Sequence, residues 1–221
     1  MVLKSIVIKG VKMGSEVFNE HAKEYELWYE KYKPVYLSEI EAIRPHLVKG
    51  LSLEIGVGSG RFAEPLRIDF GLDPSTEMLK LAKNRKIKVI KGVAERLPFK
   101  NESFDLILMV VTICFLDDPE KALFEVKRVL KPQGRIIIGF VDKESFLGKI
   151  YLSKKDKSVF YREAKFYSSE EILLLLKKAD FTSFHITQTI FKPLEEIVEL
   201  EPVKKGYGEG GFVVISATKA L

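Results

Sequence analysis

A carboxylate stands immediately before a glycine-rich turn in this sequence. Gly56, Gly58 and Gly60 follow an apolar run that predicts a short buried strand, and Glu54 lies two residues before the first of these glycines. A strand, a glycine-rich turn and a helix N-terminus together form a nucleotide-sized pocket in open α/β sheets. Glycines let the chain turn sharply and let a ligand approach the main chain closely.

The charge of Glu54 limits which ligand this turn can hold. A pyrophosphate placed there would meet a like charge, and the dinucleotide pattern Gly-x-Gly-x-x-Gly needs a small residue where this chain has Arg61. A ligand with cationic groups and no phosphate suits the site better. S-adenosylmethionine, which carries an ammonium and a sulfonium, is such a ligand. Taken alone, the glycines also fit an ordinary strand-to-helix turn.

The elements predicted around this turn alternate between strands and helices. Short strands are predicted over 51–55, 67–73, 87–90, 104–111 and 135–141, with helices over 75–85 and 119–130. This alternation implies a parallel sheet with right-handed crossovers. A helix is then predicted over 170–179. It is followed by β-like runs over 181–191 and 212–218, which favour an antiparallel pair at the sheet edge.

The remaining segments predict how the domain is organised. Residues 1–14 are a weak strand or a disordered arm, and 15–221 form one domain. Its first part, 15–49, is a helical cap with helices over 15–33 and 35–48, interrupted at Pro34. Residues 142–167 are rich in lysine and aromatic residues without a clear period, and we interpret them as an insertion that covers the substrate side.

Composition narrows the classes of function. The 221 residues are 46% hydrophobic, and 36 Lys and Arg against 31 Asp and Glu give a net charge of +5. These charges are interspersed, which favours a solvated surface over a nucleic-acid footprint. One cysteine and three scattered histidines predict no disulfide and no metal site. With no apolar run long enough to span a membrane and no signal-peptide core, we expect a cytoplasmic protein.

Several further pieces, in this order and spacing, resemble the class I S-adenosylmethionine-dependent methyltransferases, in particular the group that includes the ubiquinone/menaquinone-biosynthesis enzymes. Besides Glu54 to Gly60 the matching pieces are Gly71-Leu-Asp-Pro-Ser75 with Met78-Leu79, Ala94-Glu-Arg-Leu-Pro-Phe99, Asn101-Glu-Ser-Phe-Asp105 and Glu125-Val-Lys-Arg-Val-Leu-Lys-Pro-Gln-Gly134. The resemblance implies a Rossmann-like α/β fold. Its sheet has seven strands, mostly parallel with one antiparallel strand near the C-terminus, and helices cover both faces.

The resemblance also implies the roles of individual residues. Asp73 would accept both ribose hydroxyls, and a carboxylate does offer two acceptor oxygens to two donors. Glu54 would lie near the ammonium, and Ala94 and Glu95 beside the adenine. The implied cofactor-binding residues are Glu54, Gly56, Val57, Gly58, Asp73, Pro74, Ala94, Glu95 and Val110. The sequence departs from the family pattern at two places. Val93 stands where many relatives have an Asp that contacts the adenine, and residues 112–116 lack the histidine that is usual after the fourth strand.

Methyl transfer from a sulfonium releases a neutral thioether, so the reaction needs alignment and desolvation rather than an acid. A base is needed only for an acceptor with a proton of high pKa, so we assign no catalytic residue. Candidate acceptor-binding residues are Tyr25, Trp28, Cys114 and Glu209. Alternatively, Tyr25 and Trp28 form the packing face of their helix, Cys114 is a small core residue and Glu209 belongs to a flexible loop tip.

The favoured function is methyl transfer to a small molecule. Methylation of RNA or protein is an alternative that the modest positive charge permits, although the usual base-amine motif after the fourth strand is missing. A non-catalytic cofactor-binding protein of the same fold is another alternative. A nicotinamide enzyme is disfavoured by Glu54 and Arg61. The sequence does not indicate the oligomeric state.

Overall fold

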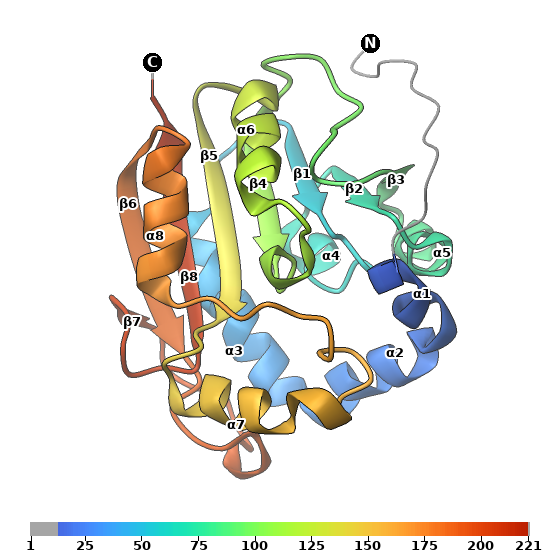
Figure 1. Ribbon diagram of the computed structural model, residues 1–221, viewed down its shortest axis with the longest axis vertical. Coiled ribbons are helices and arrows are strands. Elements are labelled where there is room, and N and C mark those ends of the chain that lie inside the picture. The colour runs from blue at the N-terminus through green and yellow to red at the C-terminus, as the bar shows by residue number, and fades with distance from the viewer. Residues whose placement is uncertain (1–12, 221) are drawn as a thin grey trace.

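The computed structural model describes the backbone of residues 13–220 (Figure 1). The predicted N-terminal arm lies outside the described residues, except that Met13 and Gly14 begin helix α1 (Met13–Glu20). Helices α2 (Ala22–Lys31) and α3 (Lys33–Ile43) follow and complete the expected N-terminal helical segment. No helix of the described chain is long and apolar enough to cross a membrane.

A mixed sheet forms the centre of the fold. The described chain contributes eight strands to it in the order β3-β2-β1-β4-β5-β8-β6-β7. Their bounds are β1 Ser52–Ile55, β2 Phe70–Asp73, β3 Lys88–Lys91, β4 Phe104–Val110, β5 Leu130–Val141, β6 Phe181–Thr189, β7 Lys204–Lys205 and β8 Phe212–Lys219. The first five strands pair in parallel, and β8 lies antiparallel between β5 and β6.

The mostly parallel methyltransferase-type sheet with an antiparallel strand near the C-terminus is therefore confirmed. The strand count differs, because β7 adds an eighth strand antiparallel to β6. Only Lys204 and Lys205 form it, and they return along the free edge of β6. A strand of two residues is too short to produce a hydrophobic period that sequence analysis detects.

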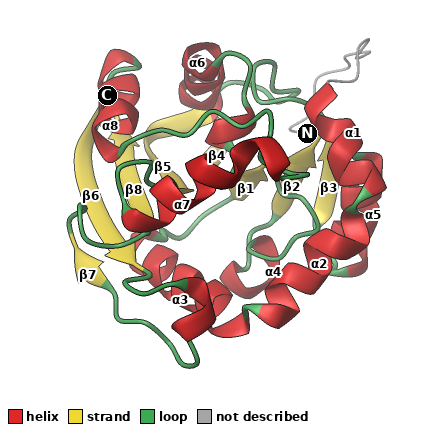
Figure 2. Cartoon of the chain, turned by 60° about the horizontal axis from the view of Figure 1, so that its bottom comes forward, coloured by secondary structure: helices red, strands yellow, loops and turns green. Residues whose placement is uncertain are grey.

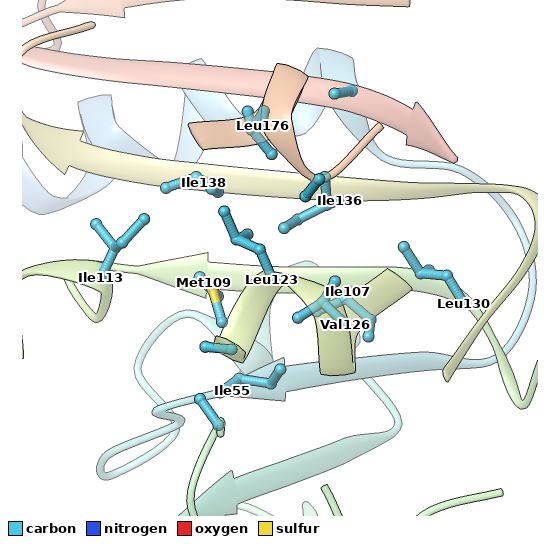
Figure 3. Close-up of a cluster of buried hydrophobic side chains, with 14 of the residues drawn as sticks. Ile55, Ile107, Met109, Ile113, Leu123, Val126, Leu130, Ile136, Ile138 and Leu176 are labelled. Atoms are coloured by element: carbon cyan, nitrogen blue, oxygen red, sulfur yellow. The ribbon is translucent and has the colours of Figure 1, made fainter. Parts of the chain in front are cut away.

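Helices cover both faces of the sheet, as predicted. Helices α6 (Pro119–Val129) and α8 (Ser169–Lys178) pack on one face, and α3, α4 (Ala63–Leu66) and α5 (Thr76–Asn84) on the other. Figure 3 shows the first of these two cores, in which Leu123 and Val126 of α6 lie over Ile107 and Met109 of β4. Leu106, Leu108 and Val110 of β4 belong to the second core, so both faces of this strand are buried, as expected for a parallel strand.

Several predicted boundaries shift for identifiable reasons. The helix expected over 15–33 bends at His21, where φ is −112°, and so divides into α1 and α2. Pro34 lies in the first turn of α3, where its missing N–H is not needed. Pro45 ends regular α-helix at Ile43, because it cannot donate an intrahelical bond. Strand β5 begins at Leu130 rather than at Arg135, and it contains an irregularity in which Gln133 has φ 61°.

The segment 142–167 contains a helix that its sequence did not indicate. Helix α7 (Phe146–Lys154) begins at Ser145, whose side chain accepts a hydrogen bond from the Gly148 N–H at 3.0 Å. Figure 2 shows α7 and α2 on the side toward which the carboxyl ends of the parallel strands point. Functional sites of open α/β sheets form at that end of the strands.

Candidate active site

A cavity of about 570 Å³ lies at the carboxyl ends of β1, β2, β4 and β5. The strand ends contribute Ile55, Leu72, Asp73, Val110 and Val141 to its wall, while α2, α3, α7 and the segment after α7 supply the opposite wall. Its volume falls within the range of roughly 300–1,000 Å³ that is usual for small-molecule sites. In the part of the chain that is described, no group of three or more His, Cys, Asp or Glu side chains could hold a metal ion.

The glycine-rich turn after β1 forms the floor of the cavity. Gly56 and Gly58 have φ values of 70° and 52°, which side-chain-bearing residues rarely adopt. A Cβ on Gly56 would overlap the Oγ1 of Thr112, so the turn also needs glycine for space. The Gly56 N–H donates to the carbonyl of Leu72 at 2.7 Å, which joins this turn to β2.

Asp73 ends β2 and faces the cavity with only 8% of its surface exposed. Its Oδ2 accepts the Gly58 N–H at 2.9 Å, and its Oδ1 accepts the Ser75 N–H at 2.8 Å. Burial raises its pKa to about 6, against the opposing effect of the two backbone donors. Each carboxylate oxygen has two lone pairs, so each retains one for a ligand donor.

Glu54 lies in the middle of β1 and is almost completely buried, with 1% exposed. Its Oε2 has no hydrogen-bond partner among the described residues. Burial raises its pKa well above the usual range, and the nearby charge of Asp73 raises it further. Glu54 and Asp73 therefore place two buried acids beside the turn.

The chain leaves β4 through a strained turn. Val111 has φ 49°, an uncommon conformation for a β-branched residue, and its N–H donates to the carbonyl of Gly139 at 2.8 Å. Cys114 follows and lines the cavity. Burial raises the pKa of its thiol to about 12, so the sulfur stays protonated at neutral pH and is no nucleophile.

The loop after β3 brings Val93, Ala94 and Glu95 to the cavity. The Oε1 of Glu95 accepts the backbone N–H of Asp117 at 3.1 Å, so this carboxylate orders the loop after β4. Asp117 also lines the cavity, next to Glu95 and the apolar Ala94. The loops after β3 and β4 therefore together form one wall of the cavity.

Ion pairs hold helix α2 over the glycine-rich turn. Glu26 accepts from Arg61 at 2.7 Å and from Arg85 at 2.7 Å, and all three side chains are mostly buried. Arg61 also pairs with Glu30 at 2.9 Å. On the inner side of the helix the Tyr25 hydroxyl lies over the turn, 3.3 Å from the position that a Gly58 Cβ would occupy.

Aromatic side chains form the far end of the cavity. Trp28 and Tyr29 of α2, Tyr151 of α7 and Tyr161 line this end together with Glu39 of α3. Burial and the nearby Glu39 charge both raise the pKa of Tyr151, so its hydroxyl is protonated. Tyr25 and Tyr29 connect this end to the glycine turn through a hydroxyl–hydroxyl contact of 2.8 Å.

Comparison with known proteins identifies the family. A family profile described as a methyltransferase domain matches residues 53–138. A crystal structure from Thermotoga maritima, described as a SAM-dependent methyltransferase and possible histamine N-methyltransferase, is 52% identical with a TM-score of 0.91, covering 92% of this chain and 99% of that one. This chain belongs to the S-adenosylmethionine-dependent methyltransferases. Its cofactor is S-adenosylmethionine.

Two curated relatives are similar over different lengths. An uncharacterised protein of Methanocaldococcus jannaschii is 51% identical, covering 92% of this methyltransferase and 98% of the relative. The demethylmenaquinone methyltransferase of Thermotoga maritima is 30% identical, covering 65% of this chain and 69% of the relative. The class I methyltransferase resemblance inferred from the motifs is thus confirmed, and the acceptor is not established by these similarities.

The structure brings most of the predicted site residues of the methyltransferase to one cavity. Those that line it are Gly56, Gly58, Asp73, Pro74, Ala94, Glu95, Val110, Tyr25, Trp28 and Cys114. Glu54 is not part of the cavity wall, and Val57 packs toward Gly71 instead of facing the cavity. Glu209 is not brought to the cavity, because its exposed side chain pairs with Lys204 at 2.6 Å.

Three features of the site were not predicted from the sequence: Glu39, Glu26 and the stabilising role of Arg61. Glu39 was the easiest to detect, since it lies between Val35 and Ile43 at a spacing of four residues on the buried stripe of α3. A charged residue in an apolar stripe is a local signal of a buried acid. The pairing of Glu26 with Arg61 links positions far apart in sequence and leaves no comparable signal.

Proposed function

We propose that this methyltransferase transfers the methyl group of S-adenosylmethionine to a small-molecule acceptor held at the aromatic end of the cavity. The observation that carries the proposal is the single cavity of about 570 Å³ that runs from Asp73 and the glycine turn to Trp28, Tyr151 and Glu39. Such a cavity suits a cofactor and a small acceptor side by side, and not a folded macromolecule. A solved relative described as a possible histamine N-methyltransferase supports an acceptor of this size.

The residues at the turn fit the cofactor. The unpartnered Glu54 oxygen needs a positive group nearby, which the methionine ammonium supplies. Asp73 is held by two backbone donors in an orientation that leaves acceptor capacity for both ribose hydroxyls. Positions 56 and 58 both need glycine, because a Cβ at position 56 would overlap the Thr112 side chain and one at position 58 would lie 3.3 Å from the Tyr25 hydroxyl. Val93, Ala94 and Glu95 form the adenine wall.

The chain's own contribution to the reaction is to position and desolvate. Bound S-adenosylmethionine supplies an electrophilic methyl group and leaves as a neutral thioether, so no residue has to act as an acid. Helix α2, held by Glu26, closes one side of the site, and residues 142–167 close the other with Tyr151 and Tyr161. Exclusion of water strengthens electrostatic contacts and holds the acceptor in line.

Titration calorimetry tests the cofactor part of this proposal. Wild-type protein should bind S-adenosylmethionine and S-adenosylhomocysteine, and NAD should not bind, because Glu54 repels its diphosphate. Tight binding of NAD would contradict the assignment of the glycine turn. Transfer of a labelled methyl group to small acceptors then separates an enzyme from a cofactor-binding protein without turnover.

An acceptor with an aromatic ring, like the one named for the demethylmenaquinone methyltransferase, is a second candidate that the aromatic lining favours. RNA is the less favoured acceptor. If the protein bound RNA, the affinity would fall steeply with added salt, since each phosphate contact releases counterions. Activity on a small acceptor that does not change with added salt would support methylation of a small molecule over methylation of RNA.

A further inference from the structure

Glu39 is a buried carboxyl group without a partner. It lines the cavity with 6% of its surface exposed, and no described residue forms a hydrogen bond or an ion pair with its side chain. Burial alone raises its pKa to about 8. An unpaired buried acid is destabilising, so its presence on the cavity wall requires an explanation other than packing.

Aromatic side chains from several elements line the same cavity as this carboxyl group. Tyr29 of α2, Tyr151 of α7 and Tyr161 all have pKa values raised in part by the nearby charge of Glu39. Trp28 lines the same end of the cavity. A carboxylate beside aromatic faces suits an organic cation. The cation forms an ion pair with the carboxylate and is attracted to the faces of the rings.

Two other ionisable residues at this end, Glu163 and Lys165, are exposed, unlike Glu39. The Lys165 ammonium lies over the ring of Tyr167, 5.1 Å from its centroid, and Tyr167 is not part of the cavity wall. Lys165 therefore does not neutralise Glu39. The buried ionisable group of this end is an acid that becomes negative when it loses its proton, which favours a cation over an acceptor that is itself a carboxylate or a phosphate.

The Glu39 end lies next to the cofactor end. Tyr29 is near Glu39, and its hydroxyl contacts that of Tyr25, whose pKa is raised by the charges of Glu54 and Asp73 after the larger effect of burial. The Tyr25–Tyr29 pair thus spans the space between the two acidic regions. A small molecule on Glu39 would lie in the same cavity as the cofactor.

We propose that Glu39 binds the amino group of the methyl acceptor, which is a small primary or secondary amine that enters as its cation. This inference rests on the proposed function and specifies its substrate class. An alcohol or phenol of the same shape brings no positive charge to pair with the ionised form of Glu39 and should bind more weakly.

Glu39 is also placed to take the proton that the amine must lose. An ammonium has no free electron pair, so one N–H bond breaks, the pair stays on nitrogen and the proton goes to a Glu39 carboxylate oxygen. The proton passes to solvent when the product leaves. A carboxyl group whose pKa is close to the operating pH can both accept and release it.

The test compares amines with alcohols of the same skeleton. Calorimetry on the full-length protein saturated with S-adenosylhomocysteine measures binding of ethylamine, benzylamine and 2-phenylethylamine against ethanol, benzyl alcohol and 2-phenylethanol. The variants are Glu39→Gln, which keeps the shape and removes the charge, and Glu41→Gln as the control. Glu41 lies on the same helix, but its side chain is exposed and pairs with Arg44 at 3.0 Å. Affinity for S-adenosylhomocysteine in each variant shows whether the fold and the cofactor end are intact.

Wild type and Glu41→Gln should bind at least one amine about tenfold or more tighter than its alcohol, and Glu39→Gln should lose this preference while retaining S-adenosylhomocysteine. The inference is overturned if wild type binds S-adenosylhomocysteine but prefers no amine of the panel, or if Glu39→Gln keeps the preference. Absence of S-adenosylhomocysteine binding in wild type would instead contradict the proposed function.

Discussion

Gly58 donates its backbone N–H to the Oδ2 of Asp73 across 2.9 Å. This bond joins the glycine-rich turn after β1 to the end of β2, and it holds the carboxylate facing the cavity before any ligand arrives. A preorganised acceptor loses less entropy on binding than a mobile one. The bond also explains why two motifs separated in sequence act as one site.

Asp73→Ala should weaken binding of S-adenosylhomocysteine by roughly 1.5–3 kcal/mol, because two hydrogen bonds to a charged acceptor are lost. Calorimetry measures this change directly. The control is Glu77→Gln on the neighbouring helix, where an exposed carboxylate pairs with Lys80. Equal affinities of Asp73→Ala and wild type would remove Asp73 from the ribose site.

Gly56→Ala should destabilise the fold and abolish tight cofactor binding. Its φ of 70° disfavours any side chain, and the new Cβ would clash with the Thr112 side chain. Gly206→Ala is the matched control, since Gly206 has φ 83° but no atom within 4 Å of the place that its Cβ would take. The control should lose only the roughly 1–2 kcal/mol expected from backbone conformation. Equal losses of unfolding free energy in both variants would show that the Thr112 contact is unimportant.

Glu26→Gln should loosen α2 and lower affinity for the cofactor several-fold. Glu26 pairs with both Arg61 and Arg85, and removing one member of a mostly buried ion-pair network leaves charges uncompensated. Hydrogen exchange of the α2 amides should increase. Glu30→Gln is the control on the same helix, because Glu30 is 63% exposed and its pair with Arg61 should contribute about 1 kcal/mol or less. If the α2 amides of both variants exchange hydrogen at the wild-type rate, the ion pairs do not stabilise the position of α2.

Glu39 should make stability fall as the pH rises. Its pKa is about 8 in the folded protein against 4.5 for an unperturbed glutamate, so between these values the unfolded chain loses the proton while the folded protein keeps it. The loss is complete above about pH 8. The facing hydroxyls of Tyr29, Tyr151 and Tyr161 have raised pKa values and stay neutral throughout.

Glu39→Gln should therefore gain a few kcal/mol over wild type between about pH 5 and about pH 8.5, since each pH unit in this window contributes at most about 1.4 kcal/mol. Urea unfolding at the two pH values measures the gain. Glu41→Gln, on the exposed side of α3, should follow the wild-type pH dependence. Parallel curves for Glu39→Gln and wild type would show that Glu39 ionises normally.

The parts of the molecule that local sequence predicts are those set by local physics. The strand–turn–helix around Gly56, the alternation of strands and helices and the position of Asp73 follow from hydrophobic period and turn chemistry within short windows. The resemblance implied seven strands, mostly parallel with one antiparallel strand. It did not include the edge strand β7, which depends on where a long connection returns beside β6.

The aromatic end of the cavity was the least predictable part of the site. Glu39, Tyr151 and Tyr161 come from three segments whose proximity depends on how α3 and α7 pack against the strand ends. The candidate Glu209 came from a glycine-rich loop that the structure directs to Lys204 instead. Aromatic residues of α2 were predicted as either a packing face or an acceptor wall, and Tyr29 of this helix is both buried and part of the cavity wall.

A crystal structure of the complex with S-adenosylhomocysteine tests the central claim most directly. The account predicts both ribose hydroxyls within hydrogen-bond distance of the Asp73 carboxylate, the amino group of the methionine portion toward Glu54, and the sulfur facing the chamber lined by Trp28, Tyr151 and Glu39. A ribose bound away from Asp73, or a sulfur that faces away from that chamber, would contradict it.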